Sequence, residues 1–223
     1  MKEEMIQDPM KKKKEITLLL APILLFGSTL IIFQVFAFIF GAKLGHFLGF
    51  VFYWVIWCIL FSILIVGVKG IPSLFKGEES PFTKKNIAFF ILAYSPAVTT
   101  LITTFIPEIA TTSFLAIISS LGLAIGMGIL EEVLWRGLYI KMFPDNLVKG
   151  IIYPSIGFTI WHLSPLLVIP TTSPGGNLAL LPGVFFIGIC FALVTWRTKS
   201  ITWAVIAHFL LNFFALGAVG LYF

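Results

Sequence analysis

The sequence predicts an all-α membrane protein, a polytopic bundle of about seven transmembrane helices. Hydrophobic residues make up 59% of the 223 positions and charged residues only 11%, whereas an average soluble domain is about 45–50% apolar and about 25% charged. The mean hydropathy is +1.04. The basic residues outnumber the acidic ones by 15 to 10, but they stand mostly at the ends of apolar runs. These observations exclude a water-soluble enzyme, a disordered tail and a nucleic-acid-binding protein.

Seven apolar runs are long enough to cross the hydrocarbon core, which requires about 20 residues of helix. In chain order they are residues 16–40, 48–68, 87–106, 114–140, 151–169, 178–196 and 201–220. The fourth run has the length of an oblique helix. An eighth, partial or interfacial helix near residues 44–50 is an alternative that the sequence leaves open.

The N-terminus is polar and rich in lysine. The run 16–40 that follows it is longer than the apolar core of a signal peptide, which has about 7–15 residues. We therefore expect the first helix to stay in the membrane uncleaved.

The distribution of lysine and arginine predicts the orientation in the membrane. Lys43 is the one basic residue in the loops that follow odd-numbered runs. Apart from Arg136 inside the fourth run, all the others precede the first run or follow even-numbered runs: Lys2, Lys11, Lys12, Lys13, Lys14, Lys69, Lys76, Lys84, Lys85, Lys141, Lys149, Arg197 and Lys199. Because cytoplasmic loops are enriched in basic residues, we expect a multi-pass protein of the cell membrane with a cytoplasmic N-terminus.

Ionisable side chains inside the apolar runs are the candidates for function, because each costs about 2.5–3.5 kcal/mol to insert into a membrane. The fourth run carries two acids and one arginine, the fifth a histidine, and the seventh a histidine with an asparagine one turn later. These residues are Glu131, Glu132, Arg136, His162, His208 and Asn212.

The depths of these side chains coincide. At about 1.5 Å of rise per helical residue, Glu131 and His208 lie about 15 Å and about 14 Å from the nearest cytoplasmic lysine. His162 and Asn212 lie about 20 Å from theirs. Three predicted helices therefore carry polar groups to one level near the middle of the membrane.

Helical geometry assigns different roles to the two acids. Neighbouring residues point about 100° apart, so Glu131 and Glu132 are not expected to share one narrow site. Glu132 precedes Arg136 by four residues, which is the favourable spacing for an ion pair on one helix face. Glu131 is left without a cation on its own helix and is available as a general base.

The histidine and asparagine of the last run complete a hydrolytic arrangement. His208 and Asn212 are four residues apart and share a helix face, so two hydrogen-bond donors point the same way. A water held by Glu131 and His162, opposite a carbonyl polarised by His208 and Asn212, would make a hydrolytic site.

Three other potentially reactive residues are not expected to take part in the function. His46 lies between the first two runs, and we expect it to be interfacial and solvated. Cys58 and Cys190 lie inside apolar runs, so we expect buried free thiols rather than a disulfide.

Three motifs resemble those of one family. Residues 131–136, EEVLWR, are similar to the EExxxR motif of the CAAX prenyl endopeptidase and bacteriocin-processing (CPBP, or Abi) family of intramembrane proteases. Residues 158–162, FTIWH, match its FxxxH motif, and residues 208–212, HFLLN, match its HxxxN/B motif. The motifs occur in the family's order and on separate runs.

The resemblance implies an endopeptidase that cleaves a membrane-associated or lipidated peptide. By the same resemblance, Glu131 and His162 would activate the water, and His208 with Asn212 would form the oxyanion hole. The implied layout is a cytoplasmic segment at 1–15, N-terminal helices at 16–110 and a catalytic core at 111–223.

The resemblance assigns supporting roles to three residues: Glu132 and Arg136 would shape the site, and Phe158 would pack beside it. No cofactor is expected to be required, because a glutamate–histidine water mechanism needs none. The alternative is a divalent metal, zinc, held by Glu131, His162 and His208.

The expected partners are a membrane-embedded peptide or protein substrate and the lipid bilayer, with no nucleic acid. In the eukaryotic and archaeal relatives the substrate is a prenylated protein with a C-terminal CaaX tail. For this chain the physiological substrate stays undefined. Gly122 and Gly126 form a GxxxG pattern that favours close helix packing, with homodimerisation as an alternative.

Two other functions remain open at this stage. The first is a non-catalytic membrane scaffold or bacteriocin self-immunity protein, in which Glu131 would be dispensable. The second is a small proton-coupled carrier that uses the same acid and histidines as a relay.

Overall fold

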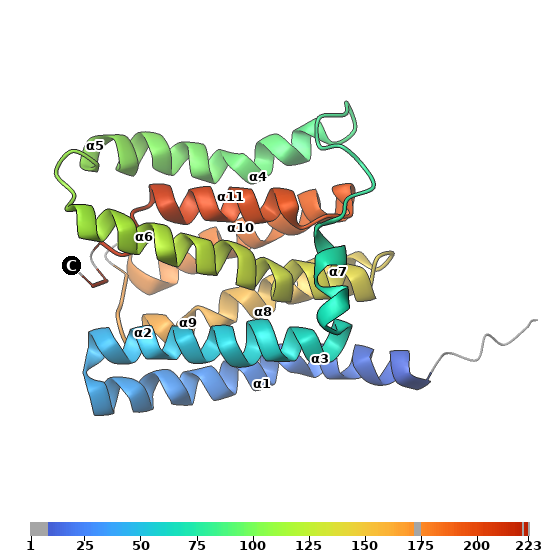
Figure 1. The fold of residues 1–223 in the computed structure, drawn as a ribbon, viewed down its shortest axis with the longest axis horizontal. Coiled ribbons are helices and arrows are strands. Elements are labelled where there is room, and N and C mark those ends of the chain that lie inside the picture. Colours follow the sequence, from blue (N-terminus) through green and yellow to red (C-terminus); the bar gives the residue numbers. More distant parts are fainter. Residues whose placement is uncertain (1–8, 172–174, 220, 223) are drawn as a thin grey trace, which may run out of the picture.

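The computed structural model describes residues 9–171, 175–219 and 221–222, and all regular structure in these residues is helical. The helices run roughly alongside one another in a single bundle (Figure 1). The all-helical class predicted from composition is therefore confirmed.

Five helices in the described part of the chain are long and apolar enough to cross a membrane: Pro9–Phe40, Ala42–Val66, Ile87–Glu108, Phe114–Met142 and Gly176–Thr198. The predicted count of seven is not confirmed. The run 151–169 is broken, because α8 (Tyr153–Trp161) ends before His162 and α9 (Leu163–Leu166) is a separate short helix. The last run forms α11 (Thr202–Phe214), which is shorter than a full span.

The first two long helices form a tight hairpin. Between α1 (Pro9–Phe40) and α2 (Ala42–Phe52) stands only Gly41, whose φ of 79° suits glycine. A Cβ atom on Gly45 would lie 2.3 Å from the backbone nitrogen of Ala37, so the two backbones are in contact. Residues 44–50 belong to α2, which continues through residues 53–61 into α3 (Ser62–Val66), so they form no separate eighth helix.

The fourth long helix has an irregular middle. It begins as α6 (Phe114–Gly126), where the Ser113 side chain caps the first turn, and it ends as α7 (Tyr139–Met142). Between them, Met127–Glu131 and Val133–Leu138 form wider π-helical turns on either side of Glu132. Such turns are rare inside α-helices and occur frequently at functional sites.

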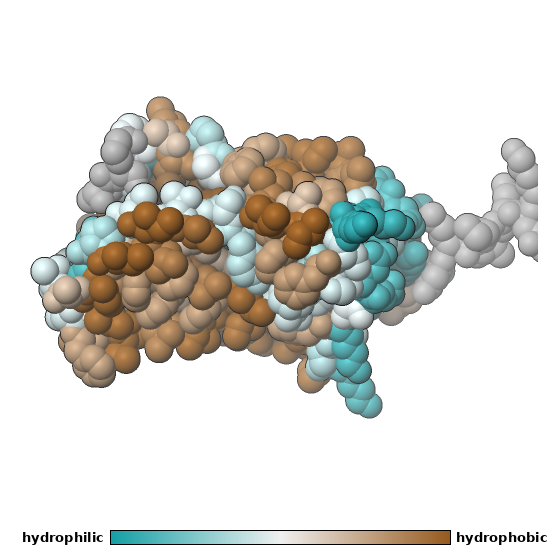
Figure 2. Space-filling model, turned by 90° about the horizontal axis from the view of Figure 1, so that it is seen from above, coloured by the Kyte–Doolittle hydropathy of each residue, from teal (hydrophilic) through white to brown (hydrophobic). Residues whose placement is uncertain are grey.

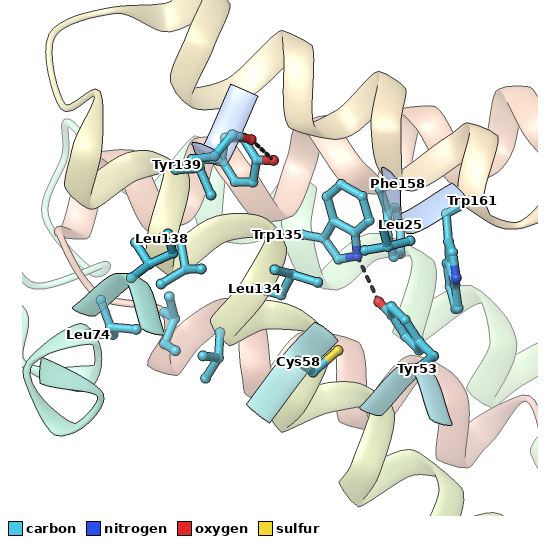
Figure 3. Close-up of a cluster of buried hydrophobic side chains, with 14 of the residues drawn as sticks. Leu25, Tyr53, Cys58, Leu74, Leu134, Trp135, Leu138, Tyr139, Phe158 and Trp161 are labelled. Atoms are coloured by element: carbon cyan, nitrogen blue, oxygen red, sulfur yellow. Dashed lines mark hydrogen bonds between the residues drawn. The ribbon is translucent and has the colours of Figure 1, made fainter. Parts of the chain in front are cut away.

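The remaining helices enclose this one. α11 packs against α6, α4 (Ile87–Thr100) and α10 (Gly176–Thr198), while α8 lies between α10 and α1. A short α5 (Ile106–Glu108) ends the third long helix. A cluster of buried side chains from α1, α2, α3, α6–α7 and α8 fills the interior (Figure 3).

The two ends of the bundle differ in charge. Lys76, Lys141 and Lys199 line one hollow at the end where α1 begins, and hydrophilic residues gather at that end in Figure 2. Lys43 lies at the other end, with Nζ 3.4 Å from the carbonyl oxygen of Tyr222. We call the first the basic end; its placement in the cytoplasm stays a prediction.

The structure corrects the interpretation of His46. Its side chain is only 3% exposed, and Nδ1 lies 2.9 Å from the hydroxyl of Tyr222. His46 is buried because the C-terminal residues fold back over α2, a contact that its sequence neighbours do not reveal. Cys58 and Cys190 are buried and free, as predicted.

Candidate active site

The four predicted catalytic side chains meet at one cavity of about 320 Å³. Glu131 comes from the π-helical part of the fourth long helix, His162 from the break between α8 and α9, and His208 and Asn212 from α11. The other lining residues are His46, Phe50, Met127, Trp161, Pro165, Leu166, Ile169, Pro170, Thr171, Leu180, Gly217, Val219 and Leu221. Four polar groups therefore converge on a largely apolar cavity, which is the usual composition of a small-molecule or peptide site.

A buried polar network supports one wall of the cavity. Oε1 of Glu132 lies 2.8 Å from Nη1 of Arg136 and 2.8 Å from Nδ1 of His208. Neither Glu132 nor Arg136 lines the cavity, and both are almost fully buried. The guanidinium also lies over the ring of Phe158, 4.5 Å from its centroid. The predicted Glu132–Arg136 pair is therefore present, and it fixes the ring of His208.

Glu131 lines the cavity and Glu132 does not, as predicted, but one histidine contacts both acids, which was not predicted. The imidazole of His208 lies between them, with Nδ1 on Glu132 and Nε2 at 4.0 Å from Oε2 of Glu131. The reason is that the two nitrogens of the ring face different directions. A single histidine can therefore contact two acids that point apart on one helix.

Glu131 is the least satisfied of the charged groups. The side chain is almost fully buried, yet its Oε1 has no hydrogen-bond partner among the described residues. Buried polar atoms are nearly always paired, so an unpaired carboxylate oxygen beside a cavity requires an explanation. A water or a substrate group in the cavity would supply the missing partner.

His162 is held in one tautomer. Its Nδ1 lies 2.8 Å from the carbonyl oxygen of Phe158, one turn earlier. Because a carbonyl only accepts, Nδ1 carries the proton and donates it, which leaves Nε2 with a free lone pair. The rings of Phe158 and Trp161 meet the imidazole edge to face, at 4.5 and 4.8 Å between centroids. In its neutral form, His162 thus presents a basic Nε2 in a rigid aromatic setting.

Asn212 completes the polar set. One of its amide hydrogens goes to the carbonyl oxygen of His208, at 3.2 Å from Nδ2. The second hydrogen is left for the cavity that this residue lines.

Several lining residues were not predicted from the sequence. Trp161 stacks on Tyr53 at 4.0 Å, and the indole of Trp135 donates to the Tyr53 hydroxyl. Aromatic residues are ordinary in membrane helices, and only the position of Trp161 beside His162 could have singled it out. His46 and the C-terminal residues line the cavity only because the chain folds back on itself. No pattern in the neighbouring sequence predicts this position.

The alternative zinc ligands Glu131, His162 and His208 line one cavity but form no ready-made metal site. Among the described residues, no group of three or more histidine, cysteine, aspartate or glutamate side chains is arranged to hold one. Within the described part of the chain, the zinc alternative therefore has no preformed set of ligands.

Comparisons with known proteins agree with the motifs. Residues 111–214 match the family model of the Type II CAAX prenyl endopeptidase Rce1-like proteins. The match spans all three motifs and α6 to α11, but not the N-terminal helices. No curated protein and no solved structure matches the chain. The family is one of proteases, and with the long apolar helices it indicates a multi-pass membrane peptidase. Over residues 111–214, the chain is therefore similar to the Rce1-like type II CAAX prenyl endopeptidases.

Proposed function

We propose that the protein is an intramembrane endopeptidase that hydrolyses a peptide bond of a membrane-associated or lipidated peptide without a metal. The observation that carries this proposal is the cavity shared by Glu131, His162, His208 and Asn212. It combines an unpaired carboxylate oxygen, a neutral imidazole with a free lone pair and an amide donor in one place.

Glu131 and His162 are proposed to activate the water. The unpaired Oε1 of Glu131 and the free Nε2 of His162 are both acceptors, so a water between them can donate both of its protons. Its oxygen then keeps its lone pairs directed away from the two bases. Positioning by two acceptors and removal of one proton are the tasks of a general base.

His208 and Asn212 are proposed to stabilise the oxyanion. In the protonated form, the His208 ring donates through Nδ1 to Glu132 and presents an Nε2–H toward the cavity. The free amide hydrogen of Asn212 provides the second donor. Two fixed donors in a water-poor site stabilise the negative charge that develops on a carbonyl oxygen.

The proposed reaction needs only substrate and water. The water oxygen bonds to the carbonyl carbon while one proton moves to Glu131 or His162. The carbon–nitrogen bond then breaks, and the same proton passes to the leaving amine. The products are a new carboxylic acid and a new amine, and the proton of the acid then passes to the amine, which gives a carboxylate and an ammonium group.

The alternatives give different outcomes in one experiment. Wild type, Glu131→Ala and the control Glu108→Ala are purified in detergent and offered a library of membrane-anchored peptides, with and without a chelator. Glu108 is an exposed acid on α5, outside the cavity. We expect cleavage by wild type and Glu108→Ala, no cleavage by Glu131→Ala, and unchanged rates in chelator, all read by mass spectrometry.

Equal cleavage by wild type and Glu131→Ala would reject Glu131 as the base. Loss of activity in chelator, with recovery on adding zinc, would reject the metal-free mechanism. If folded wild type cleaves no peptide of a broad library, the scaffold or self-immunity function gains support. Solute flux in proteoliposomes that depends on Glu131 would instead support the carrier.

A further inference from the structure

We infer that substrate reaches the cavity from the end of the bundle opposite the basic end, which the positive-inside rule places outside the cytoplasm. That a substrate enters there rests on the proposed function, whereas the position of the opening follows from the arrangement of the helices. The expected substrate is an exported or outer-leaflet-anchored peptide with apolar residues around the cleaved bond.

Chain direction places the outer part of the cavity at that end. α1 starts at the lysine-rich basic end and turns at Gly41, and His46 lies in the next turn of chain. α10 carries Arg197 in its last turn, so Leu180 near its start lies at the other end. α11 starts shortly after Lys199, so Val219, beyond its end, lies there too. These three residues, His46, Leu180 and Val219, lie at the end opposite the basic end, and all of them line the cavity.

The opposite direction is filled by packed side chains. Val133, Leu134 and Leu138 follow the two acids toward the basic end, and none is more than 5% exposed. Leu138 and Leu74 lie together in the interior, away from Tyr53 and Trp161 near the cavity (Figure 3). A peptide from the basic end would have to displace this core.

The hollow at the basic end is separate. It has a volume of about 220 Å³ and is lined by Lys76, Lys141 and Lys199 together with Gly137 and Thr195, among others. None of its described lining residues also lines the cavity that holds Glu131. The two hollows therefore lie on opposite sides of the buried core.

The outer lining indicates the chemistry of the substrate. Beyond the four polar side chains, the cavity wall is mostly apolar: Phe50, Leu166, Ile169, Leu180, Val219 and Leu221. Apolar side chains near the cleaved bond would bury this surface, whereas charged ones would lose hydration without a partner.

The test labels single cysteines from one side of the membrane. Val219→Cys, at the opening and 38% exposed in wild type, is compared with Lys76→Cys at the basic end. The native cysteines are buried, so wild type provides the background. Intact bacterial cells and permeabilised cells are treated with a charged, membrane-impermeant maleimide.

We expect Val219→Cys to react in intact cells with no further gain on permeabilisation, and Lys76→Cys to react only after permeabilisation. Leu180→Cys, deeper in the cavity, is expected to follow Val219→Cys and to lose peptidase activity on labelling. The reverse pattern would overturn the inference. Reaction of neither Val219→Cys nor Leu180→Cys until the protein is denatured would overturn it as well.

This outcome is distinguishable from failure of the proposed function. Labelling reports the opening without any cleavage. If Val219→Cys reacts from outside while Glu131→Ala still cleaves peptides, the opening stands and the catalytic assignment fails. If Glu131→Ala is inactive while only Lys76→Cys reacts from outside, the catalytic assignment stands and the direction of access fails.

Discussion

The two acids of the EExxxR motif lie side by side in the chain and in very different surroundings. Glu132 is fixed by Arg136 and His208 in a closed network away from the cavity. In the described part of the chain, each acid has one unpaired carboxylate oxygen, but only Glu131 lines the cavity. The difference separates a residue that holds the site together from one that is free to react, although both are buried acids in one motif.

The largest expected effect is on activity at Glu131. Glu131→Gln keeps the volume of the side chain but removes the base, so peptide cleavage should fall by about 10²–10⁴-fold. Thermal unfolding in detergent should change little, because the nearest cationic partner of Glu131, Nε2 of His208, lies 4.0 Å away and glutamine can still occupy that place. Glu108→Gln serves as the matched control and should retain both properties. A rate close to wild type in Glu131→Gln would remove the distinction between the two acids.

At Glu132 we expect a large effect on stability, in contrast to Glu131. Glu132→Ala leaves the Arg136 charge buried without its partner, and loss of one member of such a pair costs about 3–5 kcal/mol of stability. Thermal unfolding should therefore occur at a clearly lower temperature than in wild type, and activity should fall because His208 loses its anchor. The double variant Glu132→Leu with Arg136→Met should recover much of the stability and none of the activity. Unchanged unfolding of Glu132→Ala would contradict the supporting role of the network.

The donors around the oxyanion should have intermediate effects. Loss of one oxyanion-hole donor commonly costs about 10²–10³-fold in rate, so Asn212→Ala should reduce the turnover number by that order with little change in the Michaelis constant. Asn212→Asp, which keeps the size but places an acceptor in the site, should be at least as inactive. If Asn212→Ala altered only the Michaelis constant, the residue would bind substrate rather than the transition state.

The smallest expected effect is at the opening of the cavity. Burial raises the pKa of Tyr222 to about 12, so its hydroxyl stays protonated near neutral pH and can donate to His46. Tyr222→Phe removes one hydrogen bond and should cost about 0.5–1.5 kcal/mol of stability. Activity should remain, because neither ring belongs to the proposed mechanism. Loss of cleavage in a folded Tyr222→Phe would instead assign this pair a role in the reaction.

The sequence predicted the helical class, the ion pair at Glu132 and the polar residues that converge. It did so because the costs of burying charge make such residues conspicuous in an apolar chain. The predicted count of seven spans is not confirmed, because an apolar run does not show that a helix breaks at His162 or ends at Phe214. It also missed the burial of His46, which depends on contact with Tyr222, far away in the chain.

The sharing of His208 by both acids has a similar origin. Straight-helix geometry separates Glu131 from Glu132, but it does not include the position of a third residue on another helix. The π-helical turns around Glu132 and the packing of α11 against them decide that position. Spacing rules along one helix therefore predicted the contact between Glu132 and Arg136, but they did not predict the contacts that His208 makes from another helix.

If Glu131 activates a water molecule that hydrolyses a peptide bond, the oxygen of that water must enter the product. Cleavage in ¹⁸O-labelled water measures this transfer directly. Wild type and Glu131→Gln are incubated with a membrane-anchored peptide substrate in labelled water, and the products are read by mass spectrometry. We expect one ¹⁸O atom in the new C-terminal carboxylate for wild type, and a product yield lower by about 10²–10⁴-fold for Glu131→Gln. Labelled product in equal amounts from both proteins would contradict it.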